Sequence, residues 1–243
     1  MTEQVFTLDG YRTLVHALQE RGYQVVRFEE ARADHKHLVL RHDVDMCLER
    51  AVKLAEVEAE LGVKSVYYAL VRTEMYAVSS HRSRAHLTRL LALGREVGLH
   101  FDAAGQPDVP ESLDAAAAKD CALLEAVVSE PVRSVSFHRP TPSLQGWPRP
   151  IAGRMHAYEP RFFKHMGYCS DSQGQFRFGH PLDHDALKQG RALQLVTHPI
   201  WWVAQAQETV LDKLERFRKE RDQVLGEELA ANCKPYRERR GER

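Results

Sequence analysis

Short segments with the composition of buried β-strands alternate with helical segments through the first 140 residues. The predicted strands cover residues 38–45, 65–71, 96–102 and 132–138. Between them, apolar residues recur at three- and four-residue spacing, which predicts helices over residues 51–61, 83–93 and 112–128. Connections of this kind place successive strands parallel, with right-handed crossovers. The pattern therefore predicts an α/β fold in which helices pack outside a parallel sheet.

Length and charge narrow the class of protein. The chain has 243 residues, and we expect a single domain over residues 1–243. Lys plus Arg and Asp plus Glu each total 34, a balance that argues against a nucleic-acid-binding or membrane-surface protein. No apolar run reaches the length of a membrane span, and residues 1–10 lack the pattern of a signal peptide. We therefore expect a cytoplasmic protein; the oligomeric state is left open.

Ionisable residues stand at the carboxyl ends of most predicted strands. The first strand ends in Asp43 and Asp45, which strand alternation places on the same side. Other predicted strands end in His100 and Asp102, in His138 and Arg139, in Asp171, and in His198. In a barrel the carboxyl ends of parallel strands meet on one face. Nitrogen and oxygen donors without thiolates suit Zn²⁺ or another divalent first-row metal, so the pattern predicts a metal site there.

Each of these residues also has a structural explanation. Asp45 precedes a predicted helix and could be its N-cap. His100 could be a hydrogen-bonded core histidine, and Asp102 could be a ligand, a group that orients His100, or a turn residue. Arg139 could form a structural ion pair or keep a neighbouring carboxylate ionised. Their convergence on one face favours a functional site over separate structural roles.

The first two clusters resemble motifs of the polysaccharide deacetylase family, also called the NodB-like or carbohydrate esterase family 4 group. Asp43-Val44-Asp45 is similar to the D-x-D variant of the first motif, in which one aspartate is the base and the next binds metal. Residues 94–100, Gly-Arg-Glu-Val-Gly-Leu-His, resemble the second motif as far as its first metal histidine, His100. The resemblance covers residues 38–202 and implies a distorted (β/α) barrel with seven strands.

The remaining motifs follow in the family's order. His138-Arg139-Pro140 resembles the third motif, whose arginine contacts the base. Asp171 is similar to the acidic fourth motif, and His198 ends a segment similar to the final L-x-H, whose histidine is the general acid. The resemblance thus implies catalytic roles for Asp43, Arg139, Asp171 and His198.

One position departs from the family pattern. The second metal histidine should fall four residues after His100, where this chain has Ala104. We expect His138 or Asp102 to supply the third ligand beside Asp45 and His100. His138 is preferred because it ends a neighbouring strand and is a neutral nitrogen donor like the missing histidine.

The resemblance implies a metal-dependent hydrolase that removes an N-acyl group, acetyl or formyl, from an amino sugar. Because we expect the protein to be cytoplasmic, the favoured substrate is a nucleotide- or lipid-linked intermediate of bacterial surface polysaccharide synthesis, such as O-antigen. An assembled wall polymer is less favoured. The candidate substrate-binding residues lie in the long loop after residue 139 and just after His198. They are Trp147, Arg149, Arg154, Tyr158, Trp201 and Trp202.

Two alternatives remain from the sequence. The first is a sugar-binding barrel that has lost its metal together with the missing histidine. The second is a glycoside hydrolase that uses Asp43 and Asp45, which ranks last because both carboxylates come from one strand end instead of flanking the substrate.

Overall fold

The computed structural model describes residues 5–104, 106 and 109–241, and by its contacts the chain forms two compact units. The first unit comprises residues 1–203 and contains the sheet. The second comprises residues 204–243 and contains helices α8 (Val210–Asn232) and α9 (Lys234–Arg239). Helix α8 begins with a capping box between Thr209 and Asp212. Within the described ranges, no helix combines the length and the apolar character needed to cross a bilayer.

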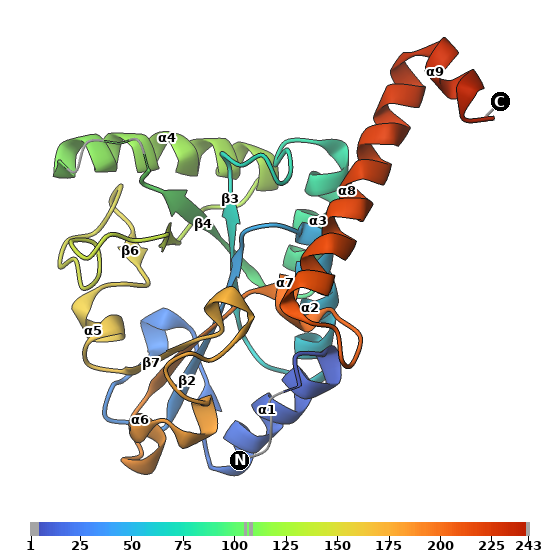
Figure 1. Ribbon diagram of the computed structural model, residues 1–243. Coiled ribbons are helices and arrows are strands. Elements are labelled where there is room, and N and C mark those ends of the chain that lie inside the picture. Colours follow the sequence, from blue (N-terminus) through green and yellow to red (C-terminus); the bar gives the residue numbers. More distant parts are fainter. Residues whose placement is uncertain (1–4, 105, 107–108, 242–243) are drawn as a thin grey trace. The chain divides into compact units, whose positions relative to one another are not determined.

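The first unit is built on a curled parallel sheet (Figure 1). Its strands follow the spatial order β6-β5-β4-β3-β2-β8-β7, with the short strand β1 paired to the start of β2. Their bounds are β1 Gln24–Val25, β2 His37–Val44, β3 Val66–Leu70, β4 Glu96–Asp102, β5 Ser134–His138, β6 Met155–His156, β7 Gly167–Ser170 and β8 Leu193–Thr197. Seven parallel strands thus form a curled half-barrel surrounded by helices. The predicted α/β fold with a distorted, seven-stranded (β/α) barrel is confirmed.

Helices connect the strands. The longer ones are α1 Leu8–Glu20, α2 Leu48–Glu60, α3 His81–Ala92 and α4 Pro110–Val128, and the single-turn ones are α5 Pro160–Phe163, α6 Asp185–Lys188 and α7 Pro199–Trp202. Helices α1 to α4 contact one another in succession (Figure 1). Their buried apolar faces, such as Leu48, Ala51 and Leu54 of α2, recur at the helical spacing seen in the sequence.

The inner face of the sheet carries polar residues where a simple core would be apolar. Asp43, on β2, pairs in register with Tyr68 of β3, which in turn pairs with Gly98 of β4. A Cβ atom at Gly98 would lie 2.4 Å from the Tyr68 ring, so only glycine lets this ring lie across β4. The Tyr68 hydroxyl then reaches Ser134 Oγ of β5, at 2.9 Å. Small residues on β4 and β5 therefore leave room inside the barrel for polar side chains.

Side chains bring the two edges of the half-barrel together. Strands β6 and β7 do not pair with each other through their backbones within the described residues. Instead, the Tyr158 ring, just after β6, lies 6.3 Å from that of Tyr168 on β7. From β8, Gln194 Nε2 donates to the carbonyl oxygens of Ala157 and Phe162, at 3.1 and 3.2 Å. We refer to this region, formed by Ala157, Tyr158, Phe162, Tyr168 and Gln194, as the seam.

A buried carboxylate joins the outer face of the sheet to the helices. Glu58 of α2 is fully buried and accepts hydrogen bonds from Tyr11, His42, Ser65 and Tyr67, at 2.6–2.8 Å. Burial alone would raise its pKa, but the interaction with His42 and these hydrogen bonds lower the pKa of Glu58 to about 2. His42 thus faces the helices while its neighbour Asp43 faces the interior. The ionised form of Glu58 stabilises the packing of α1 and α2 on β2 and β3.

Replacing Glu58 with glutamine is expected to lower the free energy of unfolding by about 3 kcal/mol at pH 7, as measured by urea denaturation. The difference in free energy of unfolding between wild type and Glu58→Gln should be largest above pH 4.5, the ordinary pKa of a glutamate. It should shrink as pH falls toward about 2. In that window the unfolded chain takes up a proton that the folded chain still excludes. Glu60→Gln, at an exposed position on the same helix, should change stability by under about 1 kcal/mol. If the stability difference between wild type and Glu58→Gln did not change with pH, Glu58 would not be ionised in the folded protein.

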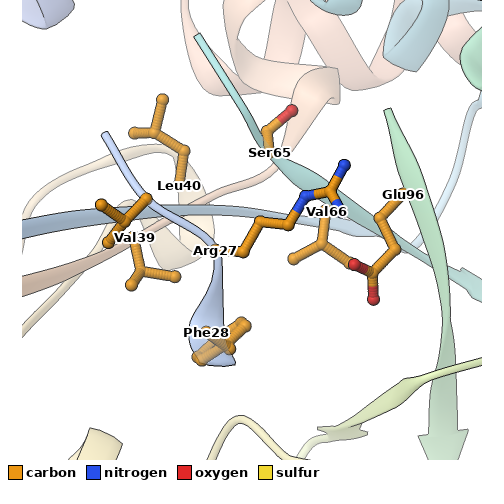
Figure 2. Close-up of a pocket in the computed structure, with 8 residues that line it drawn as sticks. Arg27, Phe28, Val39, Leu40, Ser65, Val66 and Glu96 are labelled. Atoms are coloured by element: carbon orange, nitrogen blue, oxygen red, sulfur yellow. The ribbon is translucent and has the colours of Figure 1, made fainter. Parts of the chain in front are cut away.

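A small pocket lies near the starts of the central strands, away from their carboxyl ends (Figure 2). It has a volume of about 10 Å³. Its lining comprises Val26, Arg27, Phe28, Val39, Leu40, Ser65, Val66 and Glu96. A space of this size holds about one water molecule and cannot admit a sugar.

Candidate active site

Three of the sequence-predicted metal ligands converge at the carboxyl ends of β2, β4 and β5. Donor atoms of Asp45, His100 and His138 all lie within 4.8 Å of one another. Asp45 Oδ1 is 3.0 Å from His100 Nε2 and 3.3 Å from His138 Nδ1, and the two histidine nitrogens are 3.2 Å apart. We call these three residues the donor triad.

The geometry and chemistry of the donor triad fit a zinc-like ion. Tetrahedral sites with bonds of about 2.0–2.1 Å hold their donors roughly 3.3 Å apart, close to the separations in the triad. His100 Nδ1 donates to the carbonyl oxygen of Ser136, at 3.1 Å, which turns Nε2 toward the triad. Burial would raise the pKa of Asp45, but hydrogen bonds from His100 and His138 hold it well below its usual range. Asp45 is therefore an anionic donor beside two imidazoles.

Asp102, the other candidate for the third ligand, points elsewhere. Its Oδ1 accepts a hydrogen bond from the backbone N–H of Ala104, at 2.9 Å, and its Oδ2 pairs with Arg139. Asp102 thus caps the turn after β4, while His138 lies in the triad. Of the two candidates for the third ligand, His138 is the one whose donor atom lies with those of Asp45 and His100.

Asp43 lies beside the donor triad but is held by different partners. Its two oxygens accept hydrogen bonds from Nε and Nη2 of Arg41, at 3.1 and 2.7 Å, and Ser136 Oγ lies 3.3 Å from Oδ1. Oδ2 is 3.9 Å from His100 Nε2. Burial would raise the pKa of Asp43, but the charges of Arg41 and His100 lower it to about 2. Asp43 is thus ionised at neutral pH, although its side chain is almost fully buried.

His198 approaches the triad from β8. Its Nε2 is 3.8 Å from Asp45 Oδ2, and its Nδ1 donates to Asp171 Oδ1, at 2.6 Å. Asp171 is fully buried and also accepts the backbone N–H of His198 and, at 2.6 Å, the indole N–H of Trp202. Burial would lower the pKa of His198, but the charge and hydrogen bond of Asp171 raise it to about 9. At neutral pH His198 therefore carries a proton that Nε2 presents to the site.

The expected contact between Arg139 and Asp43 is wrong. Arg139 has a φ of 49°, in the left-handed region, and its side chain is 68% exposed and pairs with Asp102. The backbone turns at this residue, directly before Pro140, and carries the guanidinium out of the barrel. Arg41 occupies the position beside Asp43 instead.

Most of the expected substrate-binding residues are committed to the fold. Trp201 and Trp202 are 5% and 0% exposed, so they offer no accessible ring face to a sugar. Tyr158 is also buried, and its hydroxyl oxygen accepts a hydrogen bond from Arg41. Arg154 pairs with Glu125, at 2.8 Å, and donates to a backbone carbonyl.

Two of the loop candidates remain accessible. Trp147 is partly buried and packs on the core, and Arg149 is exposed. These two are the candidates that substrate could reach without displacing core side chains.

Sequence reasoning missed two polar residues of the inner face. Arg41 lies within the predicted strand at 38–45, and alternation places its side chain on the same side as Asp43. Gln194, within the last strand, accepts a hydrogen bond from Arg41 Nη1, at 2.8 Å. A charged residue inside an otherwise apolar strand was the available signal, because such a group is buried only with partners.

Comparisons with known proteins find similar solved structures but no sequence match. No protein-family model matches the chain, and neither does any curated protein. The similar solved structures include a family 4 carbohydrate esterase from Bacillus anthracis, at 14% identity and a TM-score of 0.44, with 85% of each chain covered. They also include the deacetylase PplD of Streptococcus pyogenes, solved with acetate, at 12% identity and a TM-score of 0.43, with 88% of each chain covered.

A third similar structure is a CE4 family pseudoenzyme, also from Bacillus anthracis. Its identity to this chain is 14% and the TM-score is 0.43; the match covers 78% of this chain. It spans only 63% of the pseudoenzyme's length. The solved structures that resemble this chain thus include both CE4 family deacetylases and a pseudoenzyme of the same family.

Proposed function

We propose that this protein is a metal-dependent amide hydrolase that removes an N-acyl group, acetyl or formyl, from an amino sugar. One observation carries the proposal: the carboxylate of Asp43 and the imidazole of His198 both border the same donor triad. Asp43 Oδ2 lies 3.9 Å from His100 Nε2, and His198 Nε2 lies 3.8 Å from Asp45 Oδ2. A base, an acid and a set of metal donors at one barrel mouth can together hydrolyse an unactivated amide.

Asp45, His100 and His138 would hold the ion, with zinc as the favoured metal. When bound, such an ion supplies Lewis-acid polarisation of the amide carbonyl and lowers the pKa of water. Asp43 accepts the proton of the attacking water, which it can do because its carboxylate is ionised at neutral pH.

The proton for the leaving amine comes from His198, which borders the triad next to Asp45. His198 donates its Nε2 proton to the departing amine, and Asp171 stabilises the cationic ring through Nδ1. Trp202 fixes the second oxygen of Asp171, so the ring is held in one orientation. In this scheme the catalytic residues are Asp43 and His198, with Asp171 as the positioning residue.

For the substrate, we propose a nucleotide- or lipid-linked amino sugar of bacterial surface polysaccharide synthesis, of the O-antigen type, handled in the cytoplasm. The exposed Arg149, in the loop after β5, supports a substrate with phosphate groups, and Trp147 could stack on a ring. The donor triad favours the enzyme over a sugar-binding barrel without metal, because three donors at tetrahedral spacing remain despite Ala104.

Purified protein is expected to hold about one zinc ion per chain and to release acetate or formate from N-acylated amino sugars or their nucleotide-linked forms. Metal content is measured by mass spectrometry, and the released acid by a coupled assay. Removal of the metal with a chelator should abolish release, and added Zn²⁺ should restore it. At zinc concentrations 100 times Kd, binding should also stabilise the fold by about 2.7 kcal/mol, seen as a higher Tm. Protein that binds sugar but no metal would instead support the sugar-binding alternative.

A further inference from the structure

Arg41 is a charged side chain enclosed entirely within the barrel. It is 0% exposed, and each of its guanidinium nitrogens has a partner. Nε and Nη2 donate to the two oxygens of Asp43, Nη1 donates to Gln194 Oε1, and Nη2 also reaches the Tyr158 hydroxyl, at 3.0 Å. The guanidinium carbon lies 4.7 Å from the centre of the Tyr158 ring. Gln194 and Tyr158 therefore fix the plane of the guanidinium group, and that plane fixes the carboxylate of Asp43.

Asp43 lies next to the donor triad without being part of it. Its Oδ2 is 3.9 Å from His100 Nε2, whereas donors around a tetrahedral zinc ion are roughly 3.3 Å apart. Asp43 is not among the residues whose donor atoms all lie within 4.8 Å of one another, so its carboxylate would have to move toward the triad to become a fourth donor. The attraction between a divalent cation and an anionic oxygen favours that shift. The bidentate contact with Arg41 and the weaker contact with Ser136 oppose it.

Coordination by Asp43 would remove two things that the proposed reaction needs. A catalytic site keeps one position open for water or substrate, and a fourth protein ligand would fill it. The same carboxylate could then no longer accept a proton from water. A device that separates Asp43 from the metal is therefore part of the site's chemistry.

We propose that Arg41 is this device: by holding both oxygens of Asp43, it keeps that carboxylate out of the metal's coordination sphere and available as a proton acceptor. Arg41 is a positioning residue, since it acts only through Asp43. This inference rests on the proposed function. The family's third motif would give contact with the base to Arg139. We assign that contact to Arg41, which lies on the same strand as Asp43, two positions before it.

Cobalt substitution tests the proposal without an activity assay. In Arg41→Met protein loaded with Co²⁺, we expect Asp43 to join the metal, which should change the visible absorption spectrum and tighten binding at least about 5-fold. The double variant Arg41→Met/Asp43→Asn should regain the wild-type spectrum, because asparagine carries no anionic oxygen. Arg41→Lys keeps the charge but cannot hold both oxygens, and should give an intermediate spectrum.

A milder pair of variants covers the case in which Arg41→Met does not fold. Tyr158→Phe removes one hydrogen bond to Arg41 and should shift the cobalt spectrum in the same direction by a smaller amount. Tyr67→Phe is the matched control, since Tyr67 is an equally buried tyrosine that donates to Glu58 on the other face of the sheet, and it should leave the spectrum unchanged.

Turnover gives a second measurement. Arg41→Met should lower kcat at least about 10²-fold, with KM changed less than about 3-fold. One outcome would overturn the role of Arg41 and leave the proposed function intact. In it, the wild-type protein binds Co²⁺, and both Arg41→Met and Tyr158→Phe show the wild-type cobalt spectrum. Wild-type protein that binds no divalent metal would overturn both.

Discussion

Asp43→Asn is expected to lower kcat about 10³-fold while the protein still binds one metal ion per chain. The amide cannot accept a proton from water, and a positioned base contributes about 10²–10⁴-fold to such a step. The metal should stay because Asp43 is held by Arg41 and lies outside the donor triad. Steady-state kinetics on zinc-loaded protein, together with metal analysis of the same sample, measure both effects.

Stability must be followed in the same samples, because Asp43→Asn leaves the buried Arg41 without its counter-charge. Loss of one partner of a buried ion pair costs about 3–5 kcal/mol, so Tm should fall. Kinetics are therefore measured well below the Tm of the variant. If Asp43→Asn released the metal while Asp45→Asn retained both metal and fold, the roles of the two aspartates would be exchanged.

His138→Ala is expected to weaken zinc binding by more than about 100-fold and to abolish activity at ordinary zinc concentrations. In the proposed site His138 is one of three protein donors, and it would replace the histidine that is missing at Ala104. Loss of one donor removes a bond and exposes the ion to additional water. Competition with a chromophoric chelator measures the affinity directly.

Asp102→Asn is the matched control for this prediction. Asp102 lies on the strand beside His138, but its oxygens are occupied by the N–H of Ala104 and by Arg139. Its substitution should change zinc affinity less than about 3-fold, whereas Asp45→Asn should resemble His138→Ala. A large loss with Asp102→Asn and none with His138→Ala would assign the third ligand to Asp102.

The fold could be predicted because its information is local and periodic. The strand at 38–45 and the helix after it show their apolar patterns within a dozen residues, and repeated strand–helix units allow few arrangements of a sheet. The convergence of Asp45, His100 and His138 followed from the parallel direction of the strands. The order of the elements predicted that these strand ends converge, whereas the choice of Asp45 and His138 as donors came from the resemblance to the family motifs.

The errors concern side chains whose surroundings come from distant segments. Besides Asp43, the buried Arg41 has partners in Gln194 and Tyr158, more than 100 residues later. The direction of Arg139 depends on a single backbone angle, a φ of 49°, that no apolar pattern encodes. Trp202 follows the general-acid candidate in sequence, but the turn of α7 directs its indole to Asp171 and into the core. Proximity in sequence to a catalytic residue was therefore a poor guide to contact with substrate.

The seam has a consequence for how this barrel can diverge. A ladder of backbone hydrogen bonds tolerates almost any side chain, but an edge joined by Tyr158, Tyr168 and Gln194 depends on which residues stand there. Gln194 also contacts Arg41, so the amide that joins the edges is the one that orients the guanidinium beside Asp43. Changes that widen the barrel for a bulkier sugar are therefore expected to alter the base as well, and substrate range and catalytic rate should evolve together in this protein.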